Sequence, residues 1–121
     1  MKNLILSLVL VLVTISVSSA NNNPESSIVL FENEKITVST TDNNLISLAD
    51  FNVNESSFDF ETYESVDFIQ IYNSNGNLEF QLPVSSDKVR ISKNLFGLGN
   101  YKVGFLLKGS GDIKFAEVKI K

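Results

Sequence analysis

The chain has 121 residues, with fourteen acidic and ten basic side chains and a formal net charge of −4. It contains no histidine and no cysteine. These absences exclude Ser–His and Cys–His nucleophiles, the commonest zinc sites and any disulfide scaffold. The length fits one small domain.

The first twenty residues, MKNLILSLVLVLVTISVSSA, have the pattern of a secretory signal peptide. Lys2 precedes an apolar run from Leu4 to Val13, and small residues lead to Ala20. The run is shorter than the roughly 20 residues that a spanning helix needs, so we expect cleavage and not an anchor. The mature protein is then secreted, to the cell surface, the medium or the periplasm, without a membrane span. We expect residues 21–27 to form a flexible polar tail.

Charge is divided unevenly along the rest of the chain. Residues 21–67 hold ten acidic side chains and one basic side chain, whereas residues 68–121 hold four acidic and eight basic ones. We interpret this as two surfaces that partly neutralise each other when the halves pack together. The alternative is a basic C-terminal face that docks on an acidic partner. Nucleic acid is not expected as a partner, because the basic residues alternate along strands and do not cluster.

From residue 27 onward, apolar residues recur with a period of two, which is typical of half-buried strands. Leu78, Phe80, Leu82 and Val84, for example, alternate with polar residues or proline. The predicted strands are 27–31, 35–40, 44–49, 57–61, 66–73, 77–83, 87–92, 100–108 and 112–120.

Turn residues separate these strands. Asn73-Ser74-Asn75-Gly76 and Gly109-Ser110-Gly111-Asp112 supply residues that tolerate positive φ, and each predicts a hairpin. Short strands at such close spacing predict an all-β fold, an Ig-like antiparallel β-sandwich over residues 28–121. A small antiparallel barrel is the alternative.

Three strands carry special expectations. Residues 66–72 carry apolar side chains at both odd and even positions, which favours a central strand covered on both faces. Pro83 suits an edge strand or a strand end. In the last strand the apolar side chains occupy odd positions up to Phe115 and even positions from Ala116 onward, which predicts a bulge near 115–116. We also hypothesise that this last strand is a sheet edge, where Lys114, Lys119 and Lys121 discourage self-pairing but admit an acidic partner.

The candidates for chemistry are acidic and aromatic. Carboxylates at Asp59, Glu61, Glu64 and Asp67 are interpreted as a solvated face, so no catalytic residues and no enzyme activity are expected. Asp42-Asn43-Asn44 with Asp50 offers calcium ligands, but an Asx-rich turn explains it as well, and no metal or cofactor is expected. Of the aromatic residues between 51 and 68, Tyr63 is the most plausible exposed one. Together with Glu61 and Glu64 it forms a possible ligand face.

The second half of the chain carries three sequence elements in a fixed order. They are Ile71-Tyr72-Asn73-Ser74-Asn75-Gly76, then Val89-Arg90-Ile91-Ser92 leading to Phe96-Gly97-Leu98-Gly99-Asn100-Tyr101, then Glu117-Val118-Lys119-Ile120-Lys121. With these elements, the run from Phe68 to Lys121 resembles the C-terminal sorting domain of proteins exported by the type IX (Por) secretion system of the Bacteroidota. It is also similar to small exported Bacteroidota domains of unknown function.

The resemblance implies a role for specific residues. The motif-like positions are Ile71, Tyr72, Asn73, Gly76, Gly99, Tyr101, Lys119 and Lys121. In the family the domain is an address recognised by outer-membrane machinery and not an enzyme. We therefore expect an exported, non-catalytic module that is sorting-domain-like or surface-associated. The alternative is a module of the cell envelope that binds a glycan or a protein.

Overall fold

The computed structural model describes residues 27–121; the predicted signal peptide and nearly all of the predicted tail lie outside them. The described residues form seven strands and one short 3₁₀ helix. The elements are β1 Ile28–Glu32, β2 Ile36–Thr40, β3 Ile46–Asn52, β4 Ser57–Tyr72, β5 Leu78–Ser92, η1 Lys93–Leu95, β6 Gly99–Leu107 and β7 Ile113–Ile120. No helix within residues 27–121 is long and apolar enough to cross a membrane.

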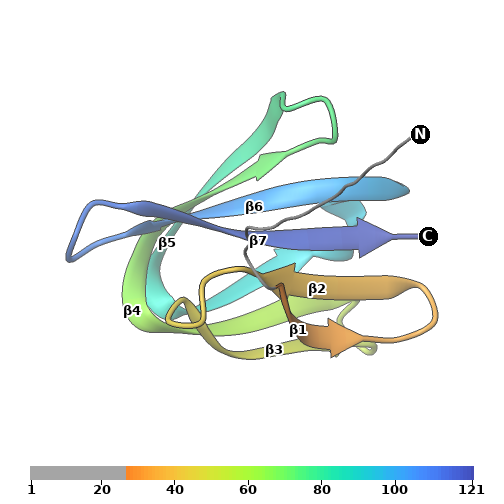
Figure 1. Cartoon of the computed structure of the whole chain (residues 1–121), viewed down its shortest axis with the longest axis horizontal. Coiled ribbons are helices and arrows are strands. Elements are labelled where there is room, and N and C mark those ends of the chain that lie inside the picture. The colour runs from red at the N-terminus through yellow and green to blue at the C-terminus, as the bar shows by residue number, and fades with distance from the viewer. Residues whose placement is uncertain (1–26) are drawn as a thin grey trace, which may run out of the picture.

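All strands join one antiparallel sheet in the order β1-β2-β7-β6-β4-β3, and β5 pairs with β4 outside this path (Figure 1). β4 is long enough to serve two parts of the sheet. Its first part, 57–62, pairs with β3, and its second part, 66–72, pairs with β6. β5 follows the other edge of β4 through both parts. β1 also contacts β3, so the sheet curls round until its two ends approach each other.

This architecture confirms the predicted all-β antiparallel fold. Its form lies between a sandwich and a nearly closed barrel, because the bent β4–β5 pair passes from one layer to the other (Figure 1). The inward side chains alternate with outward ones along each strand. Phe58, Phe60 and Phe105 are fully or almost fully buried at the centre. Phe60 meets Phe105 edge to face at 5.6 Å, and Phe58 meets Phe96 in the same way at 5.2 Å.

Two pairs of predicted strands are continuous in the structure. Strands predicted at 57–61 and 66–73 are both parts of β4, and those at 77–83 and 87–92 are both parts of β5. A bend joins each pair. In β4 the buried Thr62 hydroxyl donates to the carbonyl oxygen of Glu64 at 2.6 Å and approaches that of Asp87 at 3.3 Å. In β5 the bend falls at Ser85, whose φ is +56°.

The prediction that the last strand is a sheet edge is wrong. β7 pairs with β6 from Ile113 to Ile120 and with β2 on its other side from Ala116 to Ile120. Lys119 therefore lies on a strand inside the sheet and does not guard an open edge. Lys114, which precedes the part paired with β2, forms an ion pair with Asp42, and the Lys121 N–H donates to the Lys35 carbonyl oxygen. β5 pairs only with β4 among the described strands, so Pro83 does lie in an edge strand, as predicted.

The predicted bulge at 115–116 is also wrong. The register between β6 and β7 is unbroken from Gly99 opposite Ile120 to Leu106 opposite Ile113. Ile113 and Phe115 point to the outer face instead, where they are 45% and 41% exposed. Residues 66–72 are paired on both edges, but Phe68 on their outer side is 38% exposed, so only one face of this segment is buried.

Candidate functional site

The outer face of β4, β6 and β7 carries apolar side chains where a small sheet usually presents polar ones. Pairing places Phe68 opposite Leu106 and Leu106 opposite Ile113 in one row across the strands. Another row brings Tyr72 opposite Lys102 and Lys102 opposite Glu117. Phe115 lies between these rows, and its ring centroid is 6.2 Å from that of Tyr72. We call Phe68, Tyr72, Leu106, Ile113 and Phe115 the outer platform.

A glycine makes room for this platform. Gly104 lies opposite Phe115 in the β6–β7 ladder. A Cβ atom at Gly104 would lie 3.0 Å from Cε1 of Phe115 and 3.2 Å from Cγ2 of Ile113. The missing side chain therefore lets the phenylalanine ring lie over β6 toward Tyr72.

One end of the platform opens into a groove of about 460 Å³. The β4–β5 turn forms one wall, with Asn73 and Gly76, and Tyr72, Lys102, Phe115 and Glu117 line the rest. The Lys102 ammonium lies 5.9 Å from the centre of the Phe115 ring, within the range of a cation–π contact. Neither Lys102 nor Glu117 forms an ion pair within residues 27–121. The groove thus combines aromatic rings with one cation and one anion, which lie opposite each other across β6 and β7 without direct contact.

The motif-like residues gather at the same end of the sheet. β4 ends, β6 begins and β7 ends there, with Tyr72 paired to Lys102, Gly99 to Ile120 and Asn100 to Lys119. Ile71 is fully buried in the core. Tyr72, Asn73, Gly76 and Tyr101 belong to the lining of the groove. Lys119 and Lys121 are exposed beside it.

Several motif-like residues shape the β4–β5 turn. The side-chain oxygen of Asn73 accepts hydrogen bonds from the backbone N–H groups of Asn75 and Asn77 at 2.9 and 3.1 Å. The N–H of Gly76 donates to the Asn73 carbonyl at 2.9 Å, and its φ of +84° suits glycine. The Asn73 amide also donates to Glu79 at 2.9 Å. The turn is therefore fixed by its own side chains.

Tyr101 fastens the loop before β6. Its hydroxyl accepts a hydrogen bond from the Gly97 N–H at 2.9 Å, and its ring meets Phe96 edge to face at 5.1 Å. Gly99, with φ of +118°, makes the corner into the strand. These two motif-like residues hold the beginning of β6 in place.

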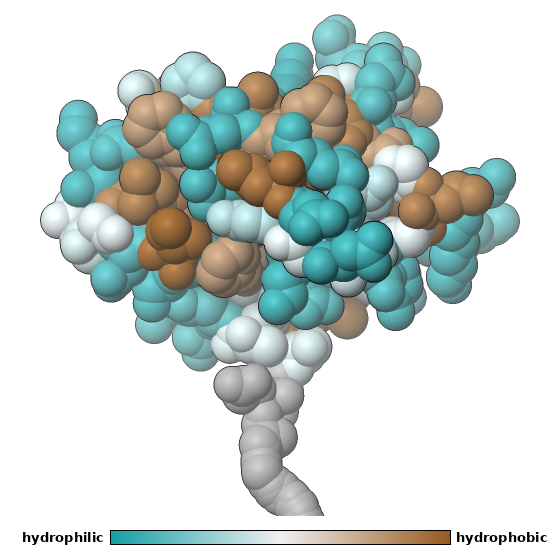
Figure 2. Space-filling model, turned by 90° about the horizontal axis from the view of Figure 1, so that it is seen from above, coloured by the Kyte–Doolittle hydropathy of each residue, from teal (hydrophilic) through white to brown (hydrophobic). Residues whose placement is uncertain are grey.

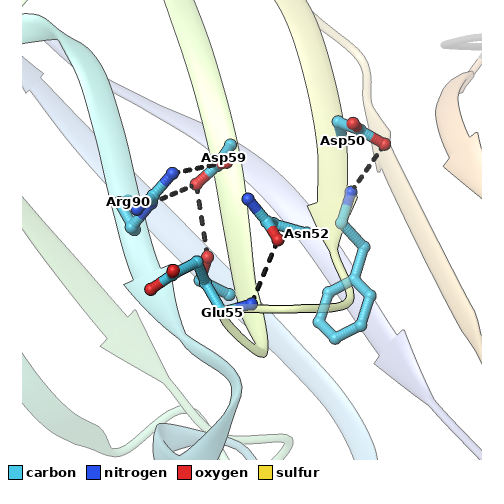
Figure 3. A network of polar contacts seen from close by, with 7 residues as sticks. Asp50, Asn52, Glu55, Asp59 and Arg90 are labelled. Atoms are coloured by element: carbon cyan, nitrogen blue, oxygen red, sulfur yellow. Dashed lines mark hydrogen bonds and ion pairs between the residues drawn. The ribbon is translucent and has the colours of Figure 1, made fainter.

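A second hollow lies on the outer face of β3, β4 and β5, where charged residues line it (Figure 3). Arg90 donates two hydrogen bonds to Asp59, at 2.7 and 3.1 Å. Figure 3 shows the two side chains facing each other from β4 and β5. This hydrogen bond holds the pKa of the Asp59 carboxyl below its usual range. Asp59 is thus committed to an ion pair across the strands.

The structure places the predicted ligand face beside this hollow but does not gather it into one site. Glu61 lines the hollow. Tyr63 is 63% exposed at the bend of β4, while Phe58 and Phe60 are buried, so its predicted exposure is confirmed; Phe68, at 38%, is exposed as well. The Glu64 carboxylate lies beside Gly109 in the β6–β7 turn.

Asp42 is engaged by a protein cation. Its carboxylate accepts from the Lys114 ammonium at 2.9 Å and from the Asn44 N–H at 2.9 Å, which is an Asx turn. The contact with Lys114, more than that with Asn44, lowers the pKa of Asp42. Within residues 27–121 no group of three or more histidine, cysteine, aspartate and glutamate side chains could hold a metal ion.

Lys102, Phe115 and Glu117 were not singled out from the sequence as a site. The available signal in the last strand is that its apolar side chains change from odd to even positions after Phe115, a change that also predicts a bulge. With a regular register, the same change indicates an apolar outer face. Figure 2 shows apolar side chains reaching the surface between polar ones on the side seen from above Figure 1.

No protein-family model, curated protein sequence or solved structure matches this chain.

Proposed function

We propose that this chain is an exported, non-catalytic domain of the sorting type, and that outer-membrane secretion machinery recognises the sheet end at the β4–β5 turn. The observation that carries the proposal is the convergence of the motif-like residues. Four of the eight motif-like residues, Tyr72, Asn73, Gly76 and Tyr101, line one groove, and Lys119 lies opposite Asn100 of the same lining. Residues far apart in the sequence thus form one surface.

The two roles of the motif-like residues support this reading. Ile71, Asn73, Gly76, Gly99 and Tyr101 hold the core, the turn and the corner of this end in shape. Lys119 and Lys121 are exposed and are left to meet a partner. A shaped end with two projecting cations suits recognition by a surface with acidic groups.

The carboxylates give no comparable support to catalysis. Asp59 is held by Arg90 and Asp42 by Lys114, so both have lowered pKa values and are poor proton donors near neutral pH. A catalytic acid usually needs the opposite shift.

The test is delivery of the full chain in a Bacteroidota host with working type IX machinery and in an isogenic strain without its outer-membrane channel. The protein is followed with an antibody in surface, medium and periplasmic fractions. We expect surface or medium delivery only with the channel. The variant Lys119→Glu/Lys121→Glu is expected to remain in the periplasm.

The matched control is Lys88→Glu/Lys108→Glu, which makes the same charge change near the bend of β4, where Lys88 lies opposite Glu61 and the Lys108 N–H donates to the Ser65 carbonyl oxygen. It is expected to be delivered like the original chain. Equal delivery in both strains, or equal retention of both double variants, would contradict the proposal.

A second candidate function is a binding module of the cell envelope. It is favoured by the groove, where the rings of Tyr72 and Phe115 lie beside Lys102 and Glu117. This candidate does not require type IX export, because any secreted domain could use the same surface.

A further inference from the structure

We propose that the groove between the β4–β5 turn and the outer faces of β6 and β7 binds a neutral saccharide. The proposal concerns the ligand of one surface and does not depend on how the protein is exported. It is argued from the size, the apolar floor and the polar groups of the groove.

The groove has the dimensions and floor of a small-ligand site. Its volume of about 460 Å³ lies within the range of ligand pockets. The rings of Tyr72 and Phe115 lie 6.2 Å apart with 60° between their planes, and Phe115 is 41% exposed. A sugar ring has an apolar face of C–H groups that packs on such rings.

The polar groups favour a ligand without net charge. Lys102 can only donate hydrogen bonds and ionised Glu117 can only accept them. The two lie opposite each other across β6 and β7, and neither has an ion-pair partner within the described residues. Glu117 would repel an anionic ligand and Lys102 a cationic one. Hydroxyl groups both donate and accept, so a neutral sugar satisfies both side chains.

The wall of the groove is held in advance. Both polar atoms of the Asn73 side chain are used within the turn, and the Tyr72 hydroxyl donates to Gln70 at 2.8 Å. Such a fixed site loses little conformational entropy on binding. The groups that form the wall are therefore already in position before the ligand binds.

The position of the groove disfavours an extended peptide. On the floor of the groove, Tyr72 of β4, Lys102 of β6 and Glu117 of β7 are each paired on both edges. Beside the groove only the three residues Gly99–Tyr101 of β6 lack a partner on the β4 side, which is a short edge for strand addition. Recognition on this face depends on side chains, as the packing of a sugar on aromatic rings does.

The experiment titrates the purified protein, residues 21–121, with neutral hexasaccharides of glucose, xylose, mannose and N-acetylglucosamine. Binding is followed by calorimetry and by amide chemical shifts. We expect a saturable response to at least one probe, with the largest shifts at Tyr72, Lys102 and Phe115. Phe115→Ala is expected to weaken binding by about tenfold or more.

Two further variants keep the test independent of folding. Glu117→Gln and Lys102→Met change only a charged, exposed group, and each is expected to weaken binding. Phe68→Ala is the matched control, because Phe68 is a similarly exposed phenylalanine on the same face but does not line the groove. It is expected to bind like the original chain.

If none of the neutral probes gives a saturable response, the proposal is overturned. A response only to an anionic probe such as polygalacturonate, or equal losses in Phe68→Ala and Phe115→Ala, also overturns it. Export in cells plays no part in these measurements, so a negative result here leaves the sorting proposal standing, and the reverse also holds.

Discussion

At the scale of single residues, phenylalanine has two distinct uses in this protein. Phe58, Phe60 and Phe105 fill the core, where each is at most 2% exposed. Phe68 and Phe115 lie on the outer platform and keep about two fifths of their surface exposed. The same side chain therefore stabilises the fold in one place and forms a surface in the other.

This division predicts unequal effects of truncation on stability. Phe60→Ala removes an edge-to-face contact with Phe105 and leaves a cavity, so the free energy of unfolding is expected to fall by about 3–5 kcal/mol. Phe68→Ala removes a ring that water already reaches, so its loss is expected to be much smaller. Urea unfolding followed by circular dichroism compares the two. Equal losses would contradict the assignment of Phe68 to the surface.

At the scale of elements, the β4–β5 hairpin organises the sheet. β4 has neighbours on both edges along most of its length, and β5 reaches from the turn at Asn73 to η1. The turn is closed by side-chain hydrogen bonds as well as backbone ones. Asn73 is thus a structural residue beside the proposed sites.

Asn73→Ala is expected to destabilise the fold by about 1–2 kcal/mol, because two backbone N–H groups lose the side-chain oxygen that accepts from them. Asn73→Asp/Glu79→Gln keeps an acceptor for these N–H groups, and the glutamine amide at position 79 can donate to the new carboxylate in place of the bond from Asn73 to Glu79, so it is expected to recover most of the loss. Thermal unfolding of the two variants provides the measurement. If Asn73→Asp/Glu79→Gln is as unstable as Asn73→Ala, the two N–H bonds are not what stabilises the turn.

The element scale also shows what the sequence could and could not predict. Alternation located every strand, because inward positions such as Ile36, Val38 and Ile91 are apolar and their neighbours are polar. The joins within β4 and β5 were missed because the apolar alternation is interrupted there: residues 62–65 include no aliphatic side chain, and residues 83–86 combine a proline with two serines. They are held in the strand by contacts between distant segments, such as Thr62 with Asp87.

The order of the strands in the sheet could not be predicted from local sequence patterns either, because pairing between distant segments determines it. β7 is the last strand in sequence but lies inside the sheet, because β2 from the first half of the chain pairs with it. The motif-like positions were found from a resemblance, and the structure brings them together. The partners of this groove, Lys102, Phe115 and Glu117, became visible only when the β6–β7 register was known.

At the scale of the whole molecule, the acidic and basic halves of the chain meet through ion pairs. Asp59 with Arg90 and Asp42 with Lys114 each join a residue of the first half to one of the second. Glu61 also lies opposite Lys88 across β4 and β5. This supports the interpretation that the uneven charge is partly neutralised by packing.

These pairs predict a loss of stability in acid. The Lys114 and Arg90 contacts lower the pKa values of Asp42 and Asp59 in the folded state, so at low pH the unfolded chain takes up protons more readily. Their stabilising effect is present above about pH 4, the ordinary range of an aspartate, and is lost as the pH falls through the lowered values. Both pairs are near the surface, so the effect is modest and shrinks in high salt.

The measurement is the free energy of unfolding at pH 7 and at pH 3 for the original chain and for Asp42→Asn/Asp59→Asn. The double variant starts lower at pH 7 and is expected to lose less between the two pH values, because two of the carboxylates that drive the loss are gone. Asp87→Asn serves as the control, since within residues 27–121 the Asp87 carboxylate has an ion pair only with its exposed neighbour Lys88, at 3.9 Å. It is expected to show the full acid loss. If the free energy of unfolding falls as much in the double variant as in the original chain, other carboxylates drive acid unfolding. The two ion pairs would then not contribute to the stability of the contact between the halves.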